Sequence, residues 1–269
     1  MFLDLLYLII SSLIQSATEF LPVSSSGHLF FWHLLFVSRP DDFYWDAMMH
    51  AGSLIAIVIY FRHDLKKMLI QVIRKKSMFN SPTRILVSKL IVATIPAAAT
   101  GYLAEDWIKN YLRSVWLVVA MLIIISLLFF FIEKKSQQRN VVEQLSWRQS
   151  ILIGLAQCFA FIPGTSRSGV TIIAGMSCQL TRKEAARYSF LLAIPILTGA
   201  AVKGILTIAS QGIEMRTLIM LMIGLFITFC FSFLFIKFLL NYLSKSSLVV
   251  FAWYRLSLAA LMILTLILY

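Results

Sequence analysis

The stretch "EFLPVSSSGHLFF" (19–31) places a proline, three consecutive serines and a glycine between Glu19 and His28, inside a very apolar chain. These residues suit a regular membrane helix poorly. Proline breaks the hydrogen-bond ladder, serine favours helix ends, and a charge is costly in hydrocarbon. The chain has 269 residues, of which 60% are apolar and 13% charged, and its mean hydropathy is strongly positive. This composition is typical of multi-span membrane proteins and excludes an ordinary soluble domain.

Several apolar stretches are long enough to cross a hydrocarbon core, which takes about 20 residues. Two of them, 115–132 and 217–236, contain no charged residue. The first apolar run has no basic start and no small-residue cleavage site, so we interpret it as part of the mature protein. Cysteines 158, 178 and 230 lie in apolar segments without CxxC spacing, and we expect them to be buried small side chains.

The net charge of +12 does not indicate nucleic-acid binding, because the basic residues are concentrated in a few short loops. Loops rich in Lys and Arg usually lie on the cytoplasmic side of a membrane. The basic loops are 62–84, 134–148 and 182–187. In the loops 38–46 and 104–113, acidic residues equal or outnumber the basic ones. We therefore place the first group inside and the second outside.

This assignment predicts six complete spans, at 44–61, 85–103, 115–132, 184–209, 217–236 and 248–269. Two stretches remain, 2–37 and 149–180, and each is interrupted, by "PVSSSG" (22–27) and by "PGTSRSG" (163–169). The stretch 149–180 begins and ends inside, so it cannot be a single crossing. We interpret both stretches as re-entrant helical hairpins.

The predicted fold is an all-α polytopic membrane protein with a single integral domain, 1–269. It consists of two inverted repeats, about 1–135 and 149–269, each a re-entrant hairpin followed by three transmembrane helices. A weak sequence echo supports the repeat, since the run from Gln15 to "FLPVSSSG" parallels the run from Gln157 to "FIPGTSRSG" with one residue of slack. Inverted repeats whose broken helices meet near the midplane are a known plan for membrane sites.

The two interruptions are the predicted functional site. Irregular backbone at membrane depth is tolerated only where it is buried in protein or lines a wet cavity, and ionisable residues there usually have a function. Glu19 and Arg167 each lie in one interruption. We expect the other cations within apolar segments, Lys89, Lys203 and Arg255, to extend toward the nearest membrane surface instead.

A helix that resumes after a Pro/Gly/Ser break presents free N–H groups and the positive end of its dipole, which together bind anions. Arg167 adds a planar charged fork suited to phosphate, and the serines and Thr165 add hydroxyl donors. A phosphate site at membrane depth implies a substrate with a lipid tail. Glu19 would repel phosphate unless it holds a metal ion or takes a proton, and His28 could serve as a general acid, so the set fits phosphoanhydride hydrolysis.

Structural roles remain open for several of these residues. The three serines could act only as helix caps, and His28 could be a hydrogen-bonded core histidine. His50, in "MMHAGSL" beside Gly52, is equally compatible with a structural and a functional role.

The sequence resembles the undecaprenyl-diphosphate phosphatase family, the bacitracin-resistance type of integral membrane lipid phosphatase. The resemblance spans nearly the whole chain and is carried by "TEFLPVSSSGHL" (18–29), "HAGSLIAIVIYF" (50–61), "PGTSRSG" (163–169) and "RYSFLLAIP" (187–195). It implies removal of the terminal phosphate from undecaprenyl diphosphate, which recycles the lipid carrier for cell-wall polymers and confers bacitracin resistance. It also implies a bacterial inner-membrane protein with two inverted repeats, an active site facing the periplasm and a divalent cation, Mg²⁺ or Ca²⁺.

Carried over by position, the resemblance gives catalytic roles to Glu19, Ser25, His28 and Arg167. The neighbouring residues with an expected role in substrate binding are Ser24, Ser26, Gly27, Gly164, Thr165, Ser166, Ser168 and Thr171. The family often has a second Glu where this chain has Gln15, one helical turn before Glu19. Gln15 can still ligate a metal through its carbonyl, so we expect Glu19 and Gln15 at the metal, but a mechanism with two carboxylates is in doubt.

Either Ser25 or a water molecule could attack the terminal phosphorus, and the sequence does not choose between them. Type-2 phosphatidic-acid phosphatases share "SGH" and "SR" elements but need a later histidine, and none follows His63 here. A transporter or flippase for a polyprenyl phosphate is the alternative function, because inverted repeats around an anion site also suit alternating access. A structural membrane protein would leave both interruptions unexplained, and a homodimer stays open.

Overall fold

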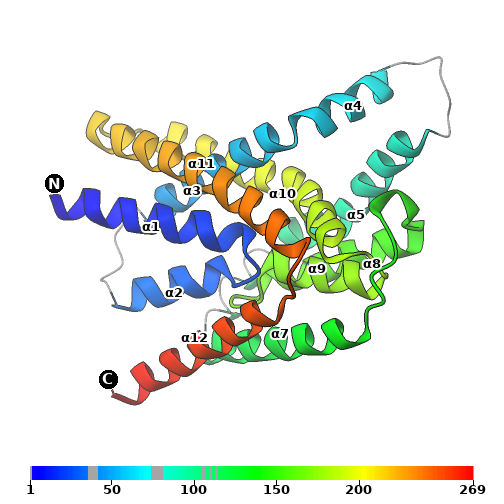
Figure 1. The fold of residues 1–269 in the computed structure, drawn as a ribbon. Coiled ribbons are helices and arrows are strands. Elements are labelled where there is room, and N and C mark those ends of the chain that lie inside the picture. The colour runs from blue at the N-terminus through cyan, green and yellow to red at the C-terminus, as the bar shows by residue number, and fades with distance from the viewer. Residues whose placement is uncertain are drawn as a thin grey trace.

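We describe the chain from a computed structural model over residues 2–35, 42–73, 81–104, 107–108, 111–112 and 114–268. Within these ranges the named elements are all helical (Figure 1), which confirms the predicted all-α class. The α-helices are α1 (Phe2–Phe20), α2 (Ser25–Leu35), α3 (Asp42–Tyr60), α4 (Arg62–Ile73), α5 (Pro82–Leu103), α7 (Val115–Lys135), α8 (Trp147–Cys158), α9 (Arg167–Ser177), α10 (Arg182–Gln211), α11 (Met215–Leu243) and α12 (Val249–Leu268). Two short 3₁₀ turns are η1 (Val142–Gln144) and η2 (Phe159–Phe161).

Five of the described helices, α5, α7, α10, α11 and α12, are long and apolar enough to cross a membrane. A sixth candidate span is the pair of α3 and α4, which meet at a bend of 75°. The multi-span prediction is therefore confirmed. Some charges used to predict sidedness, at 39, 41, 74–76, 105–106, 109 and 113, lie outside the described residues.

The basic stretch after α3 was expected to be a loop, and its first part is a helix instead. α4 begins at Arg62 directly after Phe61 and carries exposed Lys66 and Lys67 on a half-apolar segment. Its Met68 is buried against the core, so tertiary contact stabilises a helix that its charge pattern alone does not predict.

The ends of the long helices follow from local sequence. The Oγ of Ser81 accepts from the Arg84 N–H at 3.3 Å with Pro82 next in the chain, and Thr181 accepts from the Glu184 N–H at 3.3 Å. α8 starts with a capping box in which Ser146 and Gln149 satisfy each other's backbone N–H groups. These caps define where α5, α8 and α10 begin.

Close helix packing depends on small residues, as is usual in membranes. α3 packs between α10 and α11, α1 packs on α11, α8 on α5, and α7 on α12 (Figure 1). A Cβ at Gly154 of α8 would lie 2.2 Å from the Ala93 carbonyl oxygen of α5, and a Cβ at Gly52 of α3 would lie 2.6 Å from the Leu225 oxygen of α11. Glycine is therefore required at both crossings.

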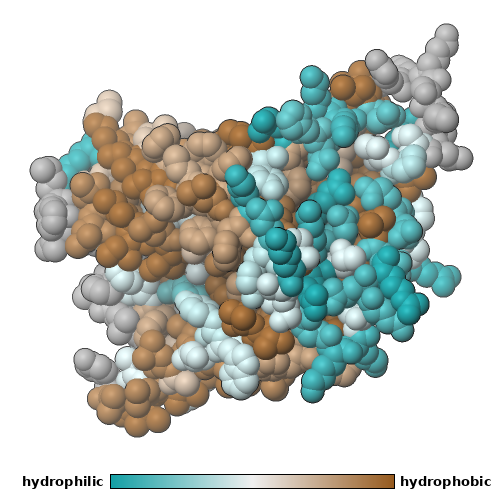
Figure 2. Space-filling model, viewed as in Figure 1, coloured by the Kyte–Doolittle hydropathy of each residue, from teal (hydrophilic) through white to brown (hydrophobic). Residues whose placement is uncertain are grey.

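Hydropathy divides the visible face into two parts (Figure 2). Hydrophobic residues cover α1, α11 and the lower left of the molecule, whereas hydrophilic residues gather on the side where α4 and α8 lie. α1 runs from the N-terminal edge toward the centre and α2 returns toward the same edge (Figure 1). The interruptions are thus confirmed as breaks between paired helices, while the inverted relation of 1–135 to 149–269 stays a prediction.

Candidate functional site

The two breaks have the same backbone geometry. Ser24 and Ser166, which directly precede α2 and α9, have φ angles of +79° and +77°. The Oγ of Ser24 accepts from the Gly27 N–H at 3.1 Å, and the Oγ of Ser166 accepts from the Gly169 N–H, also at 3.1 Å. A left-handed conformation is uncommon for a residue other than glycine and persists only where its surroundings enforce it, most often at functional sites.

This match fixes the register of the sequence echo. It pairs "SSSG" with "SRSG", so that Ser25 corresponds to Arg167, and in both motifs the first and third side chains touch. The Oγ–Oγ distance is 3.3 Å from Ser24 to Ser26 and 3.2 Å from Ser166 to Ser168. In this register Gln15 also pairs with Gln157, and the proline lies two residues before the capping serine in the first motif and three before it in the second.

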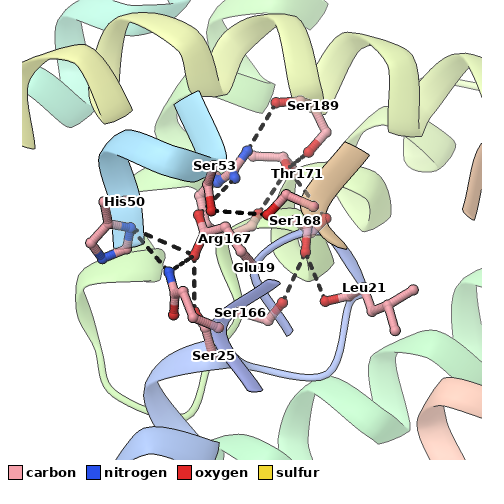
Figure 3. A network of polar contacts seen from close by, with 12 residues as sticks. Glu19, Leu21, Ser25, His50, Ser53, Ser166, Arg167, Ser168, Thr171 and Ser189 are labelled. Carbon is pink, nitrogen blue, oxygen red and sulfur yellow. Dashed lines mark hydrogen bonds and ion pairs between the residues drawn. The ribbon is translucent and has the colours of Figure 1, made fainter. Parts of the chain in front are cut away.

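Glu19, at the end of α1, joins the two breaks through its carboxylate (Figure 3). The Nη2 of Arg167 donates to Oε1 at 3.0 Å, and the hydroxyl of Ser25 donates to Oε2 at 3.2 Å. Glu19 is only 7% exposed, and Arg167 is 12% exposed. A buried carboxylate and guanidinium of this kind are stable only as a hydrogen-bonded pair, so each break depends on the other.

α10 provides a second contact that holds the Arg167 side chain in place. The other guanidinium nitrogen, Nη1, donates to the Ser189 carbonyl at 3.2 Å. Thr171 bonds the Arg167 carbonyl at 2.8 Å and the Ser189 hydroxyl at 2.6 Å (Figure 3). Thr171 is fully buried, so it supports Arg167 through these bonds and is not exposed itself.

His50 of α3 is the residue whose place sequence reasoning left undecided, and the structure puts it at Glu19. The Nε2 of Gln15 donates to Glu19 Oε2 at 3.1 Å and to the Nδ1 of His50 at 3.2 Å (Figure 3). His50 Nδ1 lies 3.9 Å from Glu19 Oε2, and His50 is 33% exposed. Because Gln15 can only donate through this nitrogen, Nδ1 accepts and a neutral His50 carries its proton on Nε2.

His28 makes its hydrogen bonds with two other residues. Its Nδ1 lies 2.7 Å from the Ser24 carbonyl oxygen and its Nε2 lies 2.7 Å from the Tyr254 hydroxyl of α12. The two rings are stacked, with an interplanar angle of 7°. Since a carbonyl only accepts, Nδ1 donates, and Nε2 of the neutral ring accepts from Tyr254.

Burial separates the remaining predicted binding residues into two groups. Ser26 is exposed and Ser25 is partly exposed, whereas the buried members are Ser24, Gly27, Gly164, Thr165, Ser166 and Ser168. Two of the buried members connect the breaks. The Gly164 N–H donates to Ser26 Oγ at 3.1 Å, and Ser168 Oγ donates to the Leu21 carbonyl at 3.3 Å. Gly164 has a φ of +91°, and a Cβ there would lie 2.6 Å from the Val118 oxygen, so only glycine fits.

The prediction that Lys89 and Arg255 extend to a membrane surface is wrong. Arg255 is 0% exposed, and its guanidinium donates to backbone carbonyls of both breaks. Lys89 is 6% exposed, and its Nζ donates to the Leu145 carbonyl. In both cases the cation donates to backbone carbonyl groups inside the protein instead of reaching a membrane surface. The position of the residue along its helix does not reveal this outcome.

The donor set near Glu19 is small for a metal. No group of three or more His, Cys, Asp or Glu side chains that could hold a metal occurs within the described ranges. The Oε1 of Gln15 is buried without a hydrogen-bond partner among the described residues, and it lies in the same amide that contacts Glu19. One carboxylate and one amide oxygen suit a hard divalent cation chemically, but the amide turns its nitrogen toward Glu19, so it would have to rotate to bring Oε1 to a shared cation.

The site can therefore bind an anion and move a proton. The hydroxyl of Ser25 points to a carboxylate that can accept its proton, and Arg167, held between Glu19 and Ser189, is placed to exchange its partner for a phosphate oxygen. This is the geometry of an oxygen nucleophile with an adjacent base, next to a permanent cation.

Comparison with known proteins gives one consistent result. The family model described as "Bacitracin resistance protein BacA" matches residues 8–261. A protein of Rubrobacter xylanophilus named undecaprenyl-diphosphatase is 36% identical, over 96% of this chain and 97% of its own length. Proteins of the same name from Pelobacter propionicus and Alteromonas mediterranea are 34% and 36% identical, over 94% and 97% of this chain and over 94% and 98% of their own lengths. The chain therefore belongs to the family of the bacitracin resistance protein BacA.

Proposed function

We propose that this chain hydrolyses undecaprenyl diphosphate to undecaprenyl phosphate and inorganic phosphate. The observation that carries the proposal is Glu19, which holds Ser25 of one break and Arg167 of the other on its two oxygens. The relatives named undecaprenyl-diphosphatase, which match nearly end to end, support the substrate. Several spans around a buried polar centre fit a substrate whose diphosphate must be processed while its tail stays in the bilayer.

Substrate binding starts with an exchange of partners at Arg167. The terminal phosphate takes the place of Glu19 on the guanidinium, while Nη1 stays on the Ser189 carbonyl. The exposed Ser26 hydroxyl and the helix starts at α2 and α9 add donors and favourable dipole ends. The released Glu19 is then free to act on Ser25.

The nucleophile is assigned to Ser25. Its hydroxyl already donates to Glu19 Oε2 at 3.2 Å, so proton removal and attack on phosphorus need no large movement. Attack by Ser25 gives a phosphoserine and releases undecaprenyl phosphate, and a water activated by Glu19 then cleaves the phosphoserine. Direct attack by water on the same carboxylate is the alternative course.

Two histidines can supply a proton to the leaving oxygen. His50 lies beside Glu19 and is partly exposed, so its Nδ1 can take up a second proton and the imidazolium can then donate one. His28 is held between Ser24 and Tyr254, and it must release Tyr254 and take up a second proton before its Nε2 can donate. We therefore give His50 the proton-transfer role at Glu19 and retain His28, on the other side of the first break, as the predicted second acid.

A divalent cation, Mg²⁺ or Ca²⁺, completes the proposed site. Glu19 and the Oε1 of Gln15 would hold it together with the substrate phosphates. When bound, such a cation supplies charge neutralisation on the diphosphate.

We infer the bacterial inner membrane as the location, with the site facing the periplasm, from the basic loops expected inside. Recycling of the lipid carrier there would support cell-wall synthesis and resistance to bacitracin. The residues that we assign to the site all come from one chain, and a homodimer stays open.

Phosphate release from undecaprenyl diphosphate in detergent tests the proposal. The wild-type chain should release phosphate with Mg²⁺ or Ca²⁺ and stop with a chelator, and Arg167→Ala should abolish release in a folded protein. No release from folded wild type with any divalent metal would reject the hydrolase. Movement of a polyprenyl phosphate across vesicles without hydrolysis would then favour the transporter alternative.

A further inference from the structure

We propose that Arg255 is the positioning residue that holds the two breaks together and gives the phosphate site its net positive charge. This inference rests on the proposed function and names a residue that sequence reasoning had assigned to the membrane surface. Arg255 lies on α12, at 0% exposure, and it is the largest fully buried side chain among the described residues.

The guanidinium of Arg255 donates to carbonyls of three separate segments. Nη2 reaches the Gly164 oxygen of the second break at 2.8 Å, and Nη1 reaches the Pro22 oxygen of the first break at 3.4 Å. Nη2 and Nε also bond the Met121 and Leu122 oxygens of α7, at 3.1 and 3.4 Å. A planar fork with five N–H donors can serve all of these acceptors at once, and no other side chain can.

These carbonyls need such a partner. Pro22 and Gly164 lie where the helices are interrupted, so their oxygens have no place in a regular helical ladder. An unpaired backbone oxygen at membrane depth is costly, and water cannot reach a residue that is fully buried. Arg255 therefore fixes the distance between the breaks and α7, and with it the distance between Ser25 and Arg167.

The charge balance of the site depends on the same residue. Glu19 and Arg167 form an ion pair at 3.0 Å and cancel each other. Within the described part of the chain, Arg255 forms no ion pair, and every acceptor it meets is a neutral carbonyl. Counting these side chains alone, one carboxylate and two guanidinium groups leave one uncompensated positive charge, and without Arg255 they leave none.

An uncompensated buried charge is unfavourable in the free protein, and the penalty falls when an anion binds nearby. Because the guanidinium is buried against the backbone of the two breaks, its charge attracts the diphosphate across that backbone without direct contact. α12 also contacts the first break at the adjacent residue, since Tyr254 bonds His28 at 2.7 Å. Two consecutive residues of α12 thus contact a site whose catalytic groups come from other helices.

Two substitutions separate the positioning role from the charge. Arg255→Lys keeps the charge but cannot span three segments, and Arg255→Gln keeps some donors but loses the charge. For Arg255→Lys we expect kcat to fall about 10-fold or more with KM within about 3-fold of wild type. For Arg255→Gln we expect the same loss of kcat and, in addition, a KM raised about 10-fold.

The experiment uses the full chain in detergent, with a short-chain polyprenyl diphosphate for kinetics and inorganic pyrophosphate for binding by thermal protection. Lys89→Met is the matched control, because Lys89 is also a buried cation on a carbonyl but lies away from the breaks. This variant should lower the melting temperature without raising KM or weakening pyrophosphate binding. If Arg255 had only a structural role, its variants would behave like Lys89→Met, with a lower melting temperature and unchanged KM and pyrophosphate binding.

Pyrophosphate bound by Arg255→Gln as tightly as by wild type, or equal KM values for the Lys and Gln variants, would overturn the inference. If the Gln variant does not fold, Arg255→Lys decides alone: unchanged pyrophosphate affinity with lowered kcat supports the inference, and a 10-fold weaker affinity rejects it. Wild type that binds pyrophosphate but releases no phosphate would reject the hydrolase while leaving this inference standing.

Discussion

At the scale of single residues, the site is organised around one carboxylate with three different neighbours. Glu19 meets a hydroxyl at 3.2 Å, a guanidinium at 3.0 Å and the amide of Gln15 at 3.1 Å. Each neighbour donates a hydrogen bond to the carboxylate, which explains how a charge is tolerated at 7% exposure. The same contacts give Glu19 its proposed roles as base and as metal ligand.

Ser25→Ala tests the assignment of the nucleophile. We expect kcat to fall at least about 1000-fold, because the attacking oxygen and its contact with Glu19 are both removed. Ser26→Ala is the matched control, since Ser26 is exposed and contacts Gly164 instead of Glu19, and its loss should stay within about 10-fold. A loss below about 10-fold in Ser25→Ala would favour direct attack by water.

Substitution of the two histidines separates the proposed acid from the predicted one. His50→Gln should lower kcat about 10- to 100-fold, because it removes the ionisable group next to Glu19. Tyr254→Phe removes only the hydroxyl that occupies His28, and it should leave kcat within about 3-fold if His50 is the donor. Steady-state kinetics across pH checks this, and wild-type activity in His50→Gln would return the role to His28.

Gln15→Glu should strengthen the dependence on a divalent cation. A carboxylate in place of the amide would face Glu19 at about the present 3.1 Å, and the two charges repel unless a cation lies between them. We expect the Mg²⁺ concentration for half-maximal phosphate release to fall several-fold, and activity at limiting Mg²⁺ to rise. An unchanged Mg²⁺ dependence would place the cation away from Gln15.

At the scale of elements, helix crossings at glycine position the breaks. Gly154→Ala should lower the melting temperature by several degrees, because its Cβ would meet the Ala93 backbone at 2.2 Å, and backbone cannot move aside cheaply. Gly199→Ala is the matched control, since no atom lies within 4 Å of its Cβ, and it should be neutral or slightly stabilising. Thermal unfolding in detergent measures both, and equal melting temperatures would show that α5 and α8 separate freely.

The sequence predicted most elements because hydropathy and breaker residues determine them locally. The six spans and both interruptions are present as helices and helix breaks. α4 was missed, because its charges resemble those of a loop while its stability comes from the contact of Met68 with the core. The sequence alone left the alignment of the two motifs undetermined by one residue, and only the φ angles of Ser24 and Ser166 determine it.

At the scale of the whole molecule, the site joins segments that are far apart in the chain. Glu19 and Arg167 could be predicted to belong to one site, because each is an ionisable residue at a helix break, but their ion pair could not. His50, Ser189 and Arg255 could not, because their roles depend on which faces of α3, α10 and α12 turn toward the breaks. Single-sequence patterns do not carry that information.

The central claim is that the two breaks form one site through Glu19 and Arg167, and a double-mutant cycle on phosphate release tests it most directly. Glu19→Gln and Arg167→Ala should each lower kcat/KM at least about 100-fold, and the double variant should be little worse than either, because both substitutions disable the same unit. Additive losses, or a single variant that keeps activity within a few-fold of wild type, would contradict the claim.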